Sequence, residues 1–176
     1  LSMDPRTRHI GVVNQGISGN QVLRNGAGLS MLARFDRDVL SRAGVRWLIL
    51  LGGINDINIR GRFGTPPLTA EELIGGYQQI ILRSHSHGIR VIGATLTPQE
   101  GQFTATEQGE QIRQAVNAWI RTSGRFDAVV DFDAAVRDPE HPRRLNPAFD
   151  PGDHIHPNDA GNAAMADAFD LGVFVR

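Results

Sequence analysis

The feature that most constrains this chain's fold is the alternation of short apolar runs with longer amphipathic segments. Four runs are typical of strands: 9–14, 45–53, 89–96 and 126–132. The segments predicted as helices are 29–43, 69–88, 105–122 and 160–169. Strands and helices that alternate in this way favour a parallel sheet with helices on both faces. The continuous apolar run at 45–53 predicts a strand that is covered on both faces.

Local signals mark the ends of these helices. Gly44 and Gly88 are typical C-terminal stops. Thr69 with Glu72 has the spacing of a capping box, and Asn158 is suited to cap the last helix. The sequence therefore predicts four strand–helix units.

Size and charge exclude several classes of protein. A chain of 176 residues that is 40% hydrophobic is predicted to form a single domain over 1–176. Its 18 basic and 19 acidic residues nearly cancel, so a nucleic-acid partner is not expected. No apolar stretch approaches the ~20 residues of a membrane span.

Two residue types are absent from the chain, and their absence limits its chemistry. There is no cysteine, and all 18 basic residues are arginine. Cysteine nucleophiles, thiolate metal sites, Schiff-base lysines and phosphate-loop lysines are therefore excluded. Covalent catalysis would have to use Ser, Thr, His, Asp, Glu or Tyr.

Ligands of parallel sheets bind beyond the carboxyl ends of the strands, so the loops after strands are the candidate sites. GISGN (16–20) and GGIND (52–56) are two such loops. Each alone is most often only a turn. As functional groups, Gly19 would offer a backbone N–H to an oxyanion, and Asn55 would offer a neutral side-chain amide.

The third loop, FDPGDHIHPNDAG (149–161), carries stronger chemistry. Asp153 and His156 are spaced so that the carboxylate can hold the imidazole tautomer and leave Nε2 free to accept a proton. A metal site built from Asp153, His154 and His156 is the rival interpretation. His85 and His87 lie where a helix is predicted to end, and there imidazoles complement the helix dipole.

Together and in this order, the three segments resemble the SGNH hydrolase superfamily of GDSL-type esterases and lipases, in its bacterial branch. GISGN is similar to the second block of that family, GGIND to the third, and DHIHPNDAG to the fifth. The resemblance implies a three-layer α/β/α fold with a mainly parallel, flavodoxin-like sheet. It assigns the oxyanion hole to Gly19 and Asn55, the base to His156 and the orienting carboxylate to Asp153.

The block that names the family, G-D-S, is not found before GISGN. Only fifteen residues precede Gly16, so the first strand and its nucleophilic serine are expected to be missing from this chain. Among the seven serines, Ser2 and Ser18 are the candidate substitutes. An N-terminal fragment or a second copy in a homo-oligomer is expected to complete the sheet. The third explanation is that the remaining strands pair with one another in a different order.

The function that the resemblance implies is hydrolysis of short-chain acyl esters by a Ser-His-Asp mechanism without a cofactor or metal. The partner is then a small-molecule ester. A catalytically silent binding or assembly domain that has lost its nucleophile is the alternative. The localisation stays open, with secretion expected only where an upstream segment carries a signal.

Overall fold

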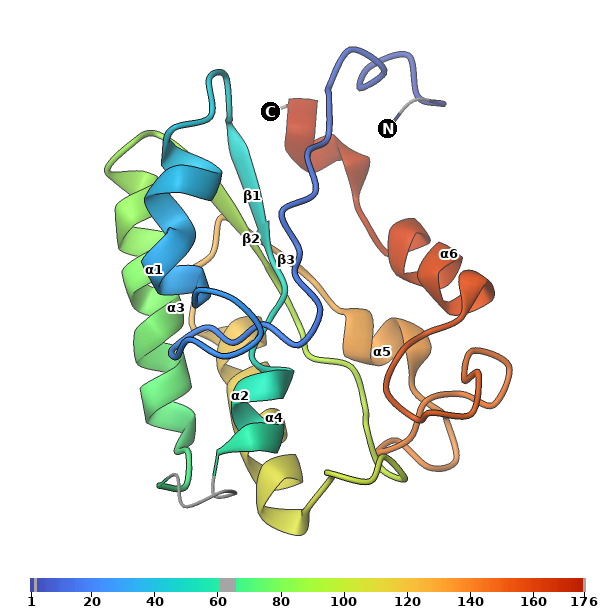
Figure 1. Ribbon diagram of the computed structural model, residues 1–176. Coiled ribbons are helices and arrows are strands. Elements are labelled where there is room, and N and C mark those ends of the chain that lie inside the picture. Colours follow the sequence, from blue (N-terminus) through green and yellow to red (C-terminus); the bar gives the residue numbers. More distant parts are fainter. Residues whose placement is uncertain (2, 61–65, 176) are drawn as a thin grey trace.

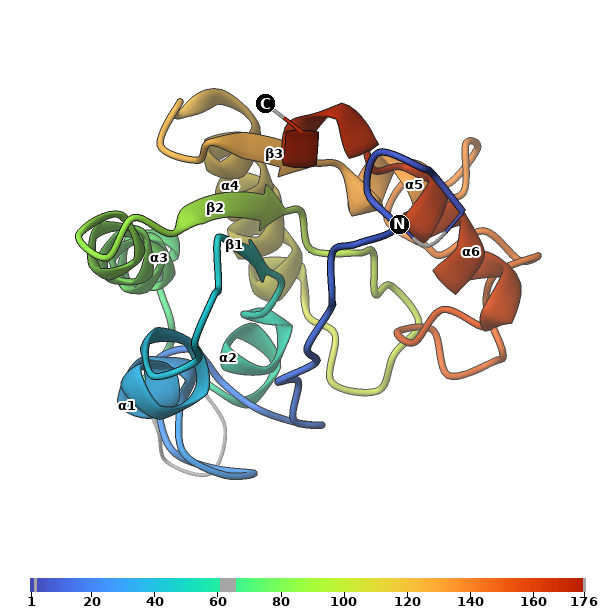
Figure 2. The same ribbon diagram turned by 90° about the horizontal axis from the view of Figure 1, so that it is seen from above.

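A computed structural model describes residues 1, 3–60 and 66–175. The strands β1 (Trp47–Leu50), β2 (Arg90–Ala94) and β3 (Ala128–Val130) form one parallel sheet in the order β1-β2-β3. The helical elements are α1 (Met31–Phe35), η1 (Asp36–Leu40), α2 (Ile54–Ile59), α3 (Ala70–His85), α4 (Glu107–Thr122), α5 (Phe132–Val136), α6 (Asp159–Asp167) and η2 (Leu171–Val175). Helices lie on both sides of the sheet, as predicted (Figures 1 and 2).

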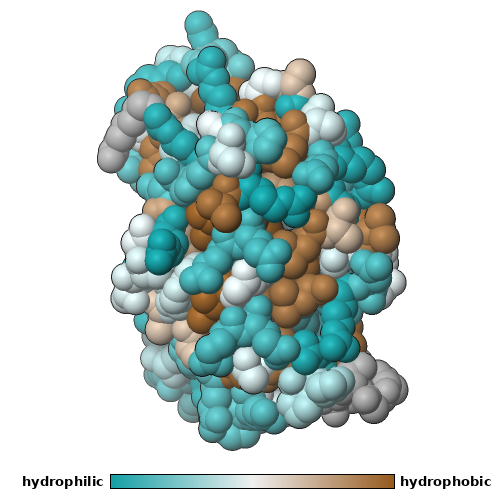
Figure 3. Space-filling model, turned by 90° about the vertical axis from the view of Figure 1, so that its left-hand side faces the viewer, coloured by the Kyte–Doolittle hydropathy of each residue, from teal (hydrophilic) through white to brown (hydrophobic). Residues whose placement is uncertain are grey.

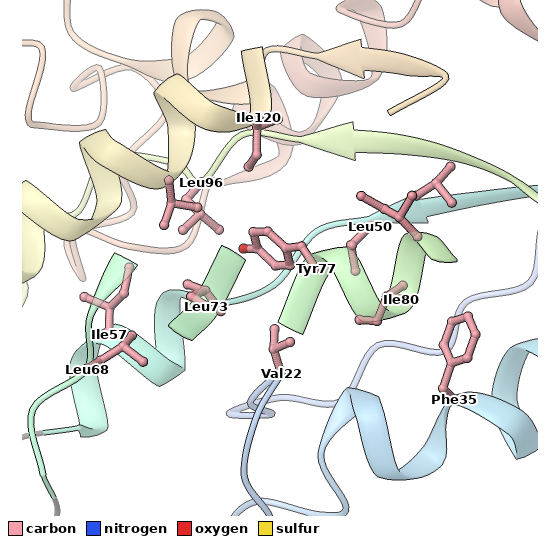
Figure 4. Close-up of a cluster of buried hydrophobic side chains, with 13 residues drawn as sticks. Val22, Phe35, Leu50, Ile57, Leu68, Leu73, Tyr77, Ile80, Leu96 and Ile120 are labelled. Carbon is pink, nitrogen blue, oxygen red and sulfur yellow. The ribbon is translucent and has the colours of Figure 1, made fainter. Parts of the chain in front are cut away.

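Alternate side chains of the strands point to opposite faces of the sheet and create two cores. On one face, Val91 of β2 packs with Leu50, Tyr77 and other side chains from β1, α3 and α4 (Figure 4). On the other face, Ile92 packs with Val130 and with partly buried side chains of α6 and η2. The result is the three-layer α/β/α arrangement that the sequence predicts.

The predicted caps hold the helices that flank the site. Thr69 and Glu72 form a complete capping box at the start of α3. The Asn158 side chain accepts from Gly161 N at the start of α6, 3.0 Å away. The helix predicted at 29–43 is shorter, because Ser30 caps α1 and the chain then continues in the π-helical turn η1.

The prediction of a strand at 9–14 is wrong. This stretch forms no strand, and it runs past the sheet on the side of α6 (Figures 1 and 2). Val12 and Val13 are 72% and 70% exposed. A β-branched run becomes a strand only when a neighbouring strand takes its backbone hydrogen bonds, and no described strand does so here. Ile10 N donates instead to Thr7 O, three residues earlier.

The prediction that the strand at 45–53 is covered on both faces is also wrong. Only Trp47–Leu50 is a strand, and Ile49 is 42% exposed. Arg90 N donates to Arg46 O, so alternate residues of β1 direct their backbone groups toward β2. Trp47 and Ile49 therefore direct theirs toward the opposite edge, where no described strand pairs with them.

The outer surface mixes polar and apolar side chains. On the side of α1 and α3, polar groups dominate and apolar ones show between them (Figure 3). Leu82 of α3 is among the exposed apolar side chains. Within the described part of the chain, no helix is long and apolar enough to cross a membrane.

Candidate active site

The loop after β1 turns sharply and positions Asn55. Gly53 has φ +124°, and a Cβ there would lie 2.6 Å from the hydroxyl of Tyr77, so the turn requires glycine. The Tyr77 hydroxyl donates to Gly52 O and fixes the same turn from the core side. The sequence placed Asn55 in a loop, but it lies in the first turn of α2. A helical turn follows because the segment INDINI buries Ile57 against the core.

Hydrogen bonds join the first turn of α2 to the segment around Gly19. Asn55 Nδ2 donates to Asn20 O over 3.2 Å. The carboxylate of Asp56, which is buried, accepts from Val22 N and Leu23 N at 2.8 and 3.0 Å. Burial raises the pKa of Asp56, although these N–H donors act against that shift. We call residues 15–23 with α2 the oxyanion side, after the role that the resemblance implies for Gly19 and Asn55.

Buried polar side chains fix the loop that carries Gly19. Arg34 donates to Gln15 O at 2.7 Å and to the Asn20 side chain at 3.1 Å, and it pairs with Asp38. Gly19 itself has φ +71°, a conformation that favours glycine. Among the described residues, none accepts a hydrogen bond from its N–H. Gly19 and Asn55 are thus brought into one unit through Asn20.

Asp153 and His156 form the pair that the sequence predicts. Asp153 Oδ2 lies 2.7 Å from His156 Nδ1, and Asp153 Oδ1 accepts from His156 N and Ile155 N. The His156 and Ile155 donors lower the pKa of Asp153 to about 2. An ionised carboxylate beside Nδ1 holds the proton there and leaves Nε2 as the basic nitrogen. The His156 side chain is 76% exposed, so substrate can reach it.

A second carboxylate–imidazole pair, which the sequence analysis missed, lies beside the first. Asp150 Oδ2 is 2.6 Å from His154 Nδ1, and its Oδ1 accepts from His154 N and Gly152 N. Burial opposes ionisation of Asp150, but these donors outweigh it and lower its pKa. The i,i+4 spacing of an acid and a histidine was the available signal. We call residues 149–157 the catalytic loop, after the role that the resemblance implies for Asp153 and His156.

These pairings bear on the metal site considered above. His154 and His156 are each hydrogen-bonded to a different carboxylate through Nδ1. Over the described ranges, no group of three His, Asp or Glu side chains could hold a metal ion.

The loop after β2 lies between the oxyanion side and the catalytic loop and contacts both. Asn58 of α2 donates to the buried Gln99 side chain over 2.7 Å. Two residues further on, Gly101 packs so closely on His154 that a Cβ at Gly101 would lie 3.0 Å from the imidazole ring. The segments that carry Asn55 and Gln99 follow the carboxyl ends of β1 and β2, where a parallel sheet positions a ligand.

Of the two serine candidates, only Ser18 lies among the described residues. Ser18 lies in an exposed turn next to Gly19, and no hydrogen bond joins its hydroxyl to His156. Ser2 lies outside the described residues. His85 pairs with Asp127 at the end of α3, consistent with a structural role.

Comparison with known proteins shows the family of this chain. Residues 3–164 match the GDSL-like Lipase/Acylhydrolase family. The chain belongs to that family. No curated protein matches the chain significantly.

Solved structures of GDSL-like proteins share the fold. A GDSL-like lipase of Bacteroides thetaiotaomicron is 20% identical, with a TM-score of 0.75 over 96% of this chain and 78% of that one. An acetylxylan esterase of Geobacillus stearothermophilus is 23% identical, with a TM-score of 0.64 over 92% and 71%. Family and neighbours together support ester hydrolysis as the general activity.

Proposed function

We propose that this protein is a serine ester hydrolase that acts on short-chain acyl esters. The observation that carries the proposal is the hydrogen bond between Asp153 and His156 Nδ1. His156 Nε2 accepts no hydrogen bond from a described residue. An exposed imidazole held in this tautomer is suited to take a proton from a hydroxyl. Gly19 and Asn55 supply the neutral donors that a developing oxyanion requires.

In the proposed mechanism, His156 removes the proton of a serine hydroxyl as its oxygen attacks the ester carbonyl. The N–H of Gly19 and the amide of Asn55 then donate to the oxyanion. His156 returns the proton to the departing alcohol, which leaves an acyl-enzyme. A water molecule, deprotonated by the same imidazole, hydrolyses that intermediate and releases the acid and the serine.

The proposal places the nucleophilic serine outside the 176 residues, on a strand that pairs with the free edge of β1. Trp47 and Ile49 direct backbone groups toward this edge, which is a template for another strand. A parallel strand there would end beside Gly52, next to Asn55. That strand comes from an N-terminal fragment. A second copy in a homo-oligomer could complete the sheet, but it carries the same 176 residues and so would bring no serine from outside them.

The alternative is a silent binding or assembly domain. It is favoured by one observation, that none of the described serines is hydrogen-bonded to His156. Hydrolysis of p-nitrophenyl acetate by the purified protein separates the two. We expect turnover that survives incubation with a metal chelator, whereas a silent domain gives no turnover. Loss of activity on chelation, restored by added metal, would instead support a metal-dependent hydrolase.

A further inference from the structure

His154 adopts a backbone conformation that favours a different residue. Its φ is +63°, and every other described residue with a positive φ is a glycine. Histidine is strained in this region because its Cβ crowds the backbone, and glycine is not. Strained residues of this kind cluster at functional sites, which makes the His154 side chain a candidate for a specific role.

Asp150 fixes the orientation of the His154 ring. The carboxylate bonds to both the backbone N and the ring Nδ1 of His154, at 3.1 and 2.6 Å. Because Nδ1 is engaged, Nε2 is the nitrogen left to meet a ligand, and no hydrogen bond to it comes from the described residues. The side chain is 47% exposed, so this nitrogen is accessible.

The other side of the ring packs on Gly101. A Cβ at Gly101 would lie 3.0 Å from both Cγ and Cδ2 of His154, a contact so tight that the ring would have to shift. Gly101 has φ +105° and belongs to the loop after β2. The ring is therefore held between two loops, one of which also carries His156.

The chemistry of ester hydrolysis decides which part of a substrate lies near His156. His156 has to protonate the oxygen of the departing alcohol, so the alcohol portion lies on the His156 side of the scissile bond. The carbonyl oxygen lies toward Gly19 and Asn55. His154 lies two residues from His156 in the same loop, and its imidazole nitrogen can exchange a hydrogen bond with a hydroxyl group.

We propose that His154 is a specificity-determining residue that binds a hydroxyl group on the alcohol portion of the ester. The proposal rests on the proposed function and names its substrate class: esters of polyhydroxylated alcohols. Hydrocarbon alcohols lack the group that His154 recognises.

The test compares two acetate esters that differ only in hydroxyl groups, glyceryl monoacetate and propyl acetate. His154→Gly removes the ring and fits the φ of +63°, so the variant is expected to fold. We expect its kcat/KM to fall about 3- to 10-fold more for glyceryl monoacetate than for propyl acetate, the range for loss of one hydrogen bond. The change is expected mainly in KM.

His87→Gly is the matched control, because it removes an exposed histidine at the far end of α3. It should leave both rates unchanged. If His154→Gly lost the same factor in kcat/KM on both esters, His154 would have a merely structural role, and the proposal would be overturned. Rates equal to those of wild type on both esters would overturn it as well.

A binding measurement tests the role of His154 independently of ester hydrolysis. The His154 imidazole proton signal, assigned by its loss in His154→Gly, is followed by NMR during titration with glycerol and with 1-propanol. We expect a saturable shift with glycerol only. Failure of wild type to hydrolyse either ester would refute the proposed function, whereas the absence of a glycerol-specific shift would refute the role of His154.

Discussion

The oxyanion side and the catalytic loop reach their geometry in opposite ways. On the oxyanion side, Asp56 and Asn55 bond to residues 33 to 35 positions away in the sequence, and Asp56 is buried. In the catalytic loop, Asp153 and His156 are three residues apart and exposed. The first unit therefore depends on the folded core, whereas the second is organised by its own backbone. The same substitution should have different consequences in the two units.

Replacing one aspartate on each side tests this difference most strongly. Asp153→Ala should lower kcat/KM by roughly 10³–10⁴-fold, because His156 loses the group that fixes its tautomer. Its unfolding free energy should change by less than about 1 kcal/mol, since the pair is exposed.

Asp56→Ala should instead lower the unfolding free energy by roughly 2–4 kcal/mol, because two N–H donors lose their buried acceptor. Urea denaturation followed by circular dichroism measures both variants. Equal destabilisation by the two substitutions would break the comparison between the sides.

Asn55→Ala sharpens the description of the oxyanion side. Loss of one oxyanion donor costs about 10²–10³-fold in kcat, and this variant should lose that much while still folding. Its hydrogen bond to Asn20 O is long, at 3.2 Å, so little stability depends on it. Initial-rate kinetics on p-nitrophenyl acetate, with thermal melting as the folding control, measure both quantities. Full activity in this variant would refute the assignment of Asn55.

The smallest effect concerns acid stability of the catalytic loop. Folding lowers the pKa of Asp153 from its ordinary value of 3.8 to about 2, so its ionised form stabilises the folded state. That contribution is present above about pH 4 and is lost as the pH falls through about 2. Asp153→Asn should therefore flatten the decrease of the melting temperature between pH 4 and 2, by a small amount because the group is exposed. An unchanged slope would contradict the shift.

The sequence predicts the local contacts of the catalytic loop but not the long-range contacts of the oxyanion side. The Asp153–His156 pair was predictable because three residues of spacing suffice to form it. The clamps made by Asp56 and Arg34 were not, because their partners are brought close only by the fold. The strand expected at 9–14 failed for a related reason, since periodicity describes a segment but not the neighbour that would pair with it. Asp150–His154 was missed although its spacing was readable.

The central claim is that His156 activates a serine supplied from outside the 176 residues. Labelling of the purified protein with a fluorophosphonate serine probe, followed by mass analysis of the labelled peptide, tests it most directly. We predict label on a serine of a peptide that these residues do not contain, and no label in His156→Ala. Label on Ser18 or Ser2 would contradict the external serine. Absence of both label and ester turnover would contradict the esterase itself.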